Sequence, residues 1–395
     1  MFTPRNDLSP AIPRFGLQRQ AGGYSGFSTD RGRCQQKHRG KSRPLRLGLL
    51  VPFHGSDAIW GPSCQYSAVL AAAEINRGRR VLGREIELFA VDAGGDPQSV
   101  VDRCREQVQA HHIDALIGVH LSSVRVALRE AFAGIIPYVF APLYEGGENT
   151  PGVFAIGDTP QQQFPAAIAW MMRQHRLQNW HIVGNDYIWP RATHQRVRGY
   201  IESSGGQVVG EDYLQLGQLD ISTLIERIRA SRADVIFESL VGSDCVLFNR
   251  AFSEAGLADR VIRLSGSIEE NTLLGIGHDH TRNLYCAASY FSALTTEANR
   301  TFMDRYRAAY GQSAPVQGVL SQSCYDAIHF FAALAERAGS LSLTALSAAF
   351  EGLSFHSVRG KQHIVSGQTH PTMYIAKAEG VQFSVVAELA DTMKN

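Results

Sequence analysis

Apolar and polar positions along this chain repeat with two alternating periods. Short apolar runs, typical of strands buried on both faces of a sheet, occur at residues 45–53, 85–91, 115–119 and 136–141. Between these runs, apolar side chains recur every three or four residues, as on one face of a helix. A repeat of strand and helix predicts parallel strands joined by helical crossovers. The first third of the chain therefore predicts an open parallel sheet covered by helices.

The same alternation begins again after residue 153. Further strands are expected at residues 153–157, 181–184, 208–214, 234–240, 261–264 and 284–290, with helices between them that include 164–173 and 193–203. Helices are then expected at residues 297–310, 316–338 and 344–351, followed by antiparallel strands at 373–378 and 383–389. The pattern predicts an α/β fold with two doubly wound, Rossmann-like lobes, whose strand ends face one cleft.

Composition separates the N-terminal segment from the rest of the chain. The 395 residues, 44% hydrophobic and 19% charged, are typical of a globular protein with two domains. Residues 1–46 hold ten Lys or Arg and two Asp, which leaves 28 basic and 35 acidic side chains elsewhere. We expect residues 1–44 to form a disordered basic tail. An acidic body does not suit direct nucleic-acid binding, and no apolar run is long enough for membrane insertion.

The cysteines and the N-terminal segment bear on the compartment. Six cysteines, at positions 34, 64, 104, 245, 286 and 324, show no paired spacing, so we expect buried free thiols. The N-terminal segment also lacks the apolar stretch of a secretory signal. Both features favour a cytoplasmic protein, with a periplasmic location as the alternative if the start site is misassigned.

Aromatic and hydroxyl side chains gather where the expected strands end. They are Trp60, Ser122, Phe140, Tyr144, Tyr187, Trp189 and Tyr290. The carboxyl ends of parallel strands meet at one edge of a sheet, beside helix N-termini with free N–H groups. A cleft with aromatic walls and few charges suits a small neutral polar ligand.

Motifs for catalysis or cofactors are weak. The serine–glycine run 203–206 lies where a helix should end, and 275–277 lacks the third glycine of a dinucleotide fingerprint. The pair of histidines in 278–280 has no further metal-ligand partner in sequence. Asp57 and the acidic pair 269–270 have no spacing that links them to a nucleophile. We expect no cofactor, metal or catalytic residue; an amide hydrolase using a serine or carboxylate is the alternative of another class.

Four segments of the sequence occur in an order that is familiar. They are residues 118–125, 144–146, 184–191 and 290–292. Together they resemble the type I periplasmic-binding-protein family, in particular its short-chain amide and urea branch. The most specific segment is 184–191, Gly-Asn-Asp-Tyr-Ile-Trp-Pro-Arg.

This resemblance implies how the chain divides into lobes. The family fold has two Rossmann-like lobes joined by three crossovers, and a hinge closes them over a ligand. The first lobe would comprise residues 45–153 and 290–352. The second would comprise residues 154–289 and 353–395.

The resemblance also implies a set of ligand-binding residues. With the strand-end aromatics, the set is His120, Ser122, Phe140, Pro142, Tyr144, Tyr187, Trp189 and Tyr290. The family's ligand-contacting serine falls on Ser122, and a threonine of the amide-binding members falls on Pro142. Tyrosine is usual where His120, Phe140 and Trp189 stand, so hydroxyl groups are lost here and bulk is gained.

The function implied is non-catalytic binding of a small amide or urea between the lobes. One role is that of a cytoplasmic ligand sensor that regulates amidase-type gene expression through an antiterminator-type protein. The alternative is the substrate-binding protein of an amide, urea or branched-chain amino acid ABC transporter, with a permease as its partner. The missing secretory stretch favours the sensor, whereas residues 267–270 resemble the transporter proteins.

Overall fold

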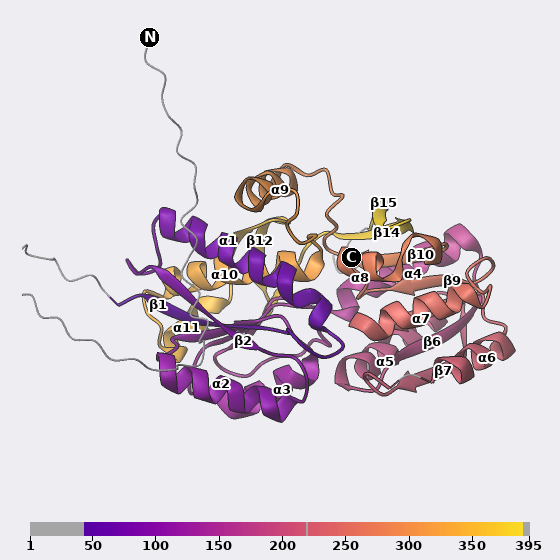
Figure 1. The fold of residues 1–395 in the computed structure, drawn as a ribbon, viewed down its shortest axis with the longest axis horizontal. Helices are drawn as coiled ribbons and strands as arrows, with labels where there is room; N and C mark the ends of the chain where they lie inside the picture. The colour runs from indigo at the N-terminus through magenta and orange to yellow at the C-terminus, as the bar shows by residue number, and fades with distance from the viewer. Residues whose placement is uncertain (1–42, 219, 390–395) are drawn as a thin grey trace, which may run out of the picture.

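The computed structural model describes residues 43–218 and 220–389. Most of the expected disordered tail, residues 1–42, therefore lies outside the described residues. Figure 1 shows two α/β lobes side by side, the first in indigo and purple with orange helices, the second in pink and salmon. Both lobes are built on largely parallel sheets, which confirms the expected fold class.

The sheet of the first lobe has five parallel strands in the order β2-β1-β3-β4-β5. They are β1 (Leu45–Val51), β2 (Ile86–Asp92), β3 (Ala115–Gly118), β4 (Tyr138–Phe140) and β5 (Val153–Ala155). The helices between them are α1 (Gly61–Arg77), α2 (Pro97–His111) and α3 (Ser122–Phe132). Six of the seven residues of β1 are buried, because helices cover both faces of the sheet.

The sheet of the second lobe has seven strands in the order β15-β14-β10-β9-β8-β6-β7. Its parallel strands are β6 (Asn179–Asn185), β7 (Gln207–Leu214), β8 (Val235–Ser239), β9 (Ile262–Ser265) and β10 (Leu284–Ala288). The antiparallel strands β14 (Met373–Glu379) and β15 (Gln382–Leu389) extend it at one edge. The helices are α4 (Pro160–His175), α5 (Ile188–Ser203), α6 (Ile221–Ser231), α7 (Gly242–Glu254) and α8 (Glu270–Ile276).

After β10 the chain returns to the first lobe. The returning helices are α9 (Glu297–Tyr310), α10 (Val319–Ala338) and α11 (Leu343–Phe350), and α10 packs along α1. A small antiparallel sheet follows, formed by β11 (Ser354–Ser357), β12 (Gly360–Val365) and β13 (Gln368–Thr369). β11 contacts α10. The lobe boundaries expected from the sequence, the one at residue 353 included, stay predictions.

Two helices of the second lobe begin earlier than expected. α4 begins at Pro160 and α5 at Ile188, whereas the sequence predicted starts at residues 164 and 193. Pro160 is the first residue of its helix and Pro190 the third residue of α5, where a backbone N–H has no intrahelical partner. The sequence pattern suggested that these prolines interrupt a helix, and the predicted helices therefore began after them. Proline is in fact favourable in the first turn of a helix. The early start places Trp189 in the first turn of α5.

A buried ion cluster ties the crossovers together. The Arg359 guanidinium donates from Nη1 to Asp158 Oδ1 (3.1 Å) and to Ser289 Oγ (2.8 Å). Its Nε also lies 3.4 Å from Asp326 Oδ2 on α10. Asp158 follows β5 and Ser289 follows β10, so the Arg359 side chain contacts two of the connections between the lobes.

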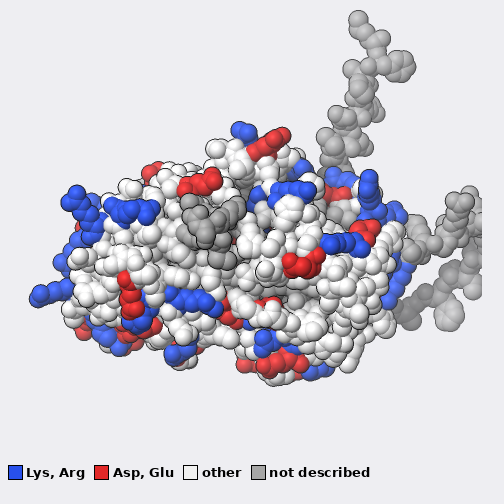
Figure 2. All heavy atoms as spheres, turned by 180° about the vertical axis from the view of Figure 1, so that it is seen from behind, with Lys and Arg blue, Asp and Glu red and all other residues white. Residues whose placement is uncertain are grey.

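The outer surface carries charges of both signs. On the face shown in Figure 2, Lys and Arg are interspersed with Asp and Glu rather than gathered in one basic stripe. Among the helices of the described residues, none combines the length and apolar character that crossing a membrane requires.

Candidate functional site

Side chains from both lobes enclose a small cavity at the carboxyl ends of the parallel strands. They are Trp60, His120, Leu121, Ser122, Pro142, Leu143, Tyr187, Trp189, Val241, Ser267 and Leu320. The cavity volume is ≈ 20 Å³, which is room for about one water molecule. The lobes therefore lie in a closed arrangement.

The strands set the position of each lining residue. In the first lobe, His120 to Ser122 follow β3, and Pro142 follows β4. In the second lobe, Tyr187 follows β6 and Ser267 follows β9. Trp60 ends the short 3-10 helix η1 (Ala58–Trp60) between β1 and α1. Two rows of strand ends thus meet face to face, as expected for open α/β sheets.

Hydrogen bonds between the lobes hold this closed arrangement. The backbone N–H of Ser243 on α7 donates to the Ser56 carbonyl in the first lobe (2.7 Å). Asn271 Nδ2 on α8 donates to Ser63 Oγ on α1 (3.0 Å). These direct contacts join the two lobes beside the cavity.

His120 forms an uncharged wall of the cavity. Its Nδ1 lies 3.1 Å from the Leu121 carbonyl oxygen, and its Nε2 lies 2.9 Å from the Tyr138 hydroxyl. A carbonyl only accepts, so Nδ1 carries the proton and Nε2 accepts from the Tyr138 hydroxyl. Burial lowers the pKa of His120 to about 4, so the ring is neutral at neutral pH. Because both ring nitrogens already form hydrogen bonds, only the carbon atoms of the imidazole are available to contact a solute.

Potential hydrogen-bond donors, in contrast, lie at the wall of the cavity. The residues that precede helices α3, α5 and α7 are Leu121, Tyr187 and Val241; all three line the cavity and none caps its helix with a side chain. The indole Nε1 atoms of Trp60 and Trp189 are buried and have no acceptor. Helix N-termini without side-chain caps, together with indole N–H groups, suit an oxygen-rich or anionic ligand.

Five of the eight residues selected from the sequence line this cavity. They are His120, Ser122, Pro142, Tyr187 and Trp189. The other three lie behind it. Phe140 packs against His120 with ring centroids 5.1 Å apart, and Tyr290 donates its hydroxyl to Asn299 Oδ1 (2.7 Å). That the lining residues contact a ligand stays a prediction.

Tyr144 lies in the second layer for an electrostatic reason. The Arg125 guanidinium sits 5.6 Å from the Phe140 ring centroid and 5.8 Å from that of Tyr144, and it pairs with Glu145 and Glu148. This buried cluster supports the loop after β4 instead of lining the cavity. The sequence showed the aromatic residues but not the arginine that orders them.

The site set selected from the sequence missed six lining residues. Trp60 was recognised as a strand-end aromatic but left out of the set. Leu121, Leu143, Val241 and Ser267 lie within three residues of the ends of expected strands, so their position was a usable signal. Leu320 lies in the first turn of α10, far along the chain, and no local pattern indicated it.

One cluster resembles a hydrolase triad. Ser239 Oγ lies 2.7 Å from His194 Nε2, and His194 Nδ1 lies 3.1 Å from Glu211 Oε1. Ser239 is fully buried, however, and a Cβ on Gly184 would already lie 2.7 Å from His194 Nε2. A substrate has no access to this serine, so the cluster stabilises the second lobe.

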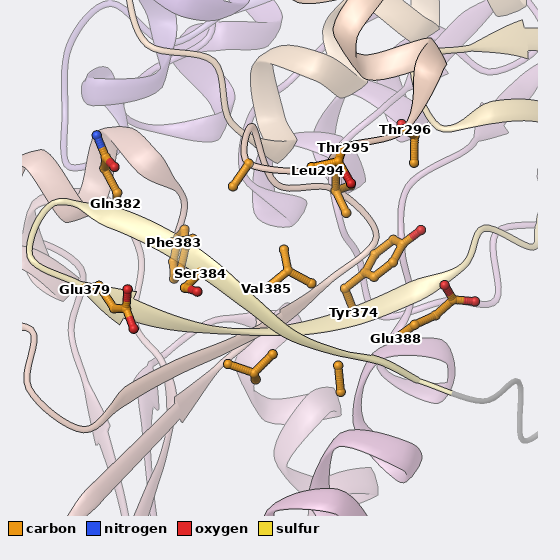
Figure 3. A pocket seen from close by; sticks show the side chains of 13 residues that line it. Leu294, Thr295, Thr296, Tyr374, Glu379, Gln382, Phe383, Ser384, Val385 and Glu388 are labelled. Carbon is orange, nitrogen blue, oxygen red and sulfur yellow. The ribbon is translucent and has the colours of Figure 1, made fainter.

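A second hollow is larger but lies elsewhere. Figure 3 shows the side chains that line an open groove between edge strand β15 and the loop with Leu294, Thr295 and Thr296. The volume of this groove is ≈ 740 Å³. It lies along the edge of the sheet rather than at the parallel strand ends, so the smaller interlobe cavity is the candidate site.

The described residues show no metal cluster and no disulfide in this region. Within residues 43–218 and 220–389, no group of three or more His, Cys, Asp or Glu is arranged to hold a metal ion. The cysteines described there, Cys64, Cys104, Cys245, Cys286 and Cys324, are buried and free, as expected. Cys34 lies outside the described residues.

Two α/β lobes that close over a cavity at their strand ends define the type I periplasmic binding protein fold, a class of solute-binding proteins. The family model described as periplasmic binding protein matches residues 44–382. The chain therefore belongs to this family, and it is a non-catalytic binding protein rather than an enzyme.

Individual relatives agree with this assignment. The chain is 20% identical over 300 residues to Leu/Ile/Val-binding protein homolog 3 of Brucella melitensis, covering 75% of this chain and 80% of the relative. An ABC transporter solute-binding protein of Rhodopseudomonas palustris, solved with p-hydroxybenzoic acid, aligns with a TM-score of 0.79 at 20% identity, covering 89% and 99% of the two chains. A leucine-binding protein of Thermotoga maritima aligns with a TM-score of 0.76 at 17% identity, covering 87% and 98%.

Proposed function

We propose that this chain is the substrate-binding component of an ABC transporter for a small organic monocarboxylate with an apolar body. The observation that carries the proposal is the convergence of donors on the cavity. Three helix N-termini without side-chain caps and two indole N–H groups without acceptors surround it. Such donors stabilise a carboxylate.

The same lining disfavours other solutes of similar size. Urea carries four N–H donors, and in this cavity they would face the indole N–H groups and the helix N-termini, which are also donors. None of the eleven lining residues is Asp or Glu, so the lining offers no carboxylate for the ammonium group of an amino acid. A short-chain amide, the solute expected from the sequence, offers one acceptor and is the second candidate. The apolar side chains of Leu121, Leu143 and Leu320 suit an aliphatic or aromatic body.

The relatives also support transport over gene regulation. Their printed names describe Leu/Ile/Val binding and ABC transporter solute binding, including benzoates. An ABC permease is then the proposed partner, in place of an antiterminator. A transport role requires export, whereas a sensor stays in the cytoplasm. Cell fractionation separates the two: recovery in the periplasmic extract supports transport, and recovery only in the cytoplasm supports the sensor.

Calorimetric titration of purified protein tests the ligand class. Benzoate and 4-hydroxybenzoate should bind saturably, and leucine, butyramide and urea at least about tenfold more weakly, because a donor left facing a donor costs about 1–3 kcal/mol. Tyr187→Ala should abolish most of the affinity, whereas Ile188→Ala, at an exposed neighbouring position, should not. Tighter binding of urea or butyramide than of benzoate would contradict the proposal, and release of ammonia would revive the hydrolase alternative.

A further inference from the structure

Two adjacent acidic side chains of the second lobe are buried against the first lobe. Glu269 and Glu270 are only 1% and 4% exposed. Glu269 Oε2 accepts from the backbone N–H of Leu320 in the first turn of α10 (3.2 Å). Glu270 Oε1 accepts from the Ser292 N–H (2.6 Å), while its Oε2 has no partner. The N-terminus of α8 thus presents two carboxyl groups to the N-terminus of a first-lobe helix.

A glycine permits this approach. A Cβ on Gly318, the residue before α10, would lie 2.9 Å from Glu269 Cβ and 2.9 Å from Glu270 Oε2. The φ of Gly318 is −138°, an extended conformation that any residue adopts. Glycine is therefore required here by the contact between lobes and not by its backbone angles.

Burial without a cation determines how the two carboxyl groups ionise. Burial raises the pKa of Glu269 and of Glu270 to about 7. The titratable side chains that face them are Cys64 from α1, Cys286 from β10 and Tyr290. Burial raises the pKa of each of these three groups well above its usual value, so they stay neutral between about pH 5 and 8. Opening of the lobes exposes the two carboxyl groups to water, where a glutamate has a pKa of about 4.3.

We propose that Glu269 and Glu270 form a proton-linked latch, in which closing the lobes takes up a proton from solvent at this pair. A carboxyl group with a higher pKa in the closed form binds more protons when closed than when open. Lowering the pH therefore favours closure. Between about pH 8 and pH 6, the closed-to-open ratio rises about tenfold for each carboxyl that takes up a proton.

Small-angle X-ray scattering of the ligand-free protein tests the latch. The radius of gyration of the wild type should fall as the pH is lowered from about 8 to about 6. The double variant Glu269→Gln/Glu270→Gln should lose this dependence, because glutamine carries no titrating proton. The exposed control Glu254→Gln should keep it. Asp57 is another buried carboxyl near the cleft, with its pKa raised to about 7 by burial, so the comparison is repeated in an Asp57→Asn background.

Two further variants keep the test decisive. If the double variant does not fold, the single variant Glu269→Gln is measured in its place. The change of its radius of gyration with pH should be smaller than that of the wild type. The added Cβ of Gly318→Ala should keep the lobes apart, so this variant should keep the larger radius of gyration at both pH values. Its melting temperature should equal that of the wild type. A wild-type radius that does not change with pH, or a double variant that keeps the full dependence, would overturn the latch.

Discussion

Arg359 and Asp158 form a buried ion pair at the connections that follow β5 and β10. Their side chains are 5% and 3% exposed, and the guanidinium also contacts Ser289 and faces Asp326. The pair joins the segment before the third crossover to the segment after β5. The hinge is thus held by charge inside the protein rather than by loops at its surface.

Replacing Arg359 should therefore destabilise the whole chain. Arg359→Met leaves Asp158 and Asp326 buried without their cation, and we expect the free energy of unfolding to fall by about 3–5 kcal/mol. Urea unfolding followed by circular dichroism measures this. The exposed control Arg260→Met should stay within about 0.5 kcal/mol of the wild type. A loss below about 1 kcal/mol for Arg359→Met would show that the cluster does not hold the hinge.

The two indole donors should contribute separately to affinity. Trp60→Phe and Trp189→Phe each remove one N–H and keep most of the apolar wall, so benzoate should bind about 5–30-fold more weakly to each, or about 1–2 kcal/mol. Trp180→Phe is the matched control, because its buried Nε1 also lacks an acceptor but its side chain is not part of the cavity wall. Titration calorimetry gives the comparison, and equal losses in all three variants would argue against indole recognition.

His120 should make stability depend on pH. Its pKa is about 4 in the folded protein and about 6.5 in an unfolded chain. The unfolded state therefore binds more protons below about pH 6.5, and folding loses up to about 3 kcal/mol as the pH falls to about 4. His120→Gln should flatten this part of the profile, whereas the exposed control His356→Gln should not. Urea unfolding at several pH values measures it; identical profiles for wild type and His120→Gln would contradict a buried neutral imidazole.

Two glycines of the second lobe should respond to alanine in opposite directions. A Cβ on Gly184 would press on Ser239 and His194, so Gly184→Ala should cost about 1–3 kcal/mol of stability. Gly199 lies inside α5 with nothing within 4 Å of an added Cβ, and Gly199→Ala should stabilise by about 0.5–1 kcal/mol. Thermal melting of both variants decides this, and a stable Gly184→Ala would mean that the buried cluster can shift.

The sequence predicted those strands and helices whose apolar residues form a continuous run or recur with a regular period. Strands such as β1 and β8 are buried on both faces and read as continuous apolar runs. β12 alternates exposed and buried residues and is largely polar, so the sequence predicted no strand there, although Ile364 is fully buried. Helix α8 is only seven residues long, too short for a periodic signal.

The candidate site was predictable only where it follows strand ends. Tyr187 and Trp189 stand next to a strand and could be placed from the local pattern. Leu320 reaches the cavity because α10 returns to the first lobe some two hundred residues after β3, a long-range contact with no local signature. Arg125 belongs to the segment 118–125 that carries the family resemblance, but its burial beside two aromatic rings depends on a loop twenty residues away.

The small volume of the interlobe cavity has a kinetic consequence. A space of ≈ 20 Å³ admits no organic solute, so only molecules that have already opened can capture one. The measured dissociation constant then equals the intrinsic constant divided by the open fraction. In stopped-flow experiments, the observed capture rate should climb with solute concentration and then level off at the rate at which the empty protein opens.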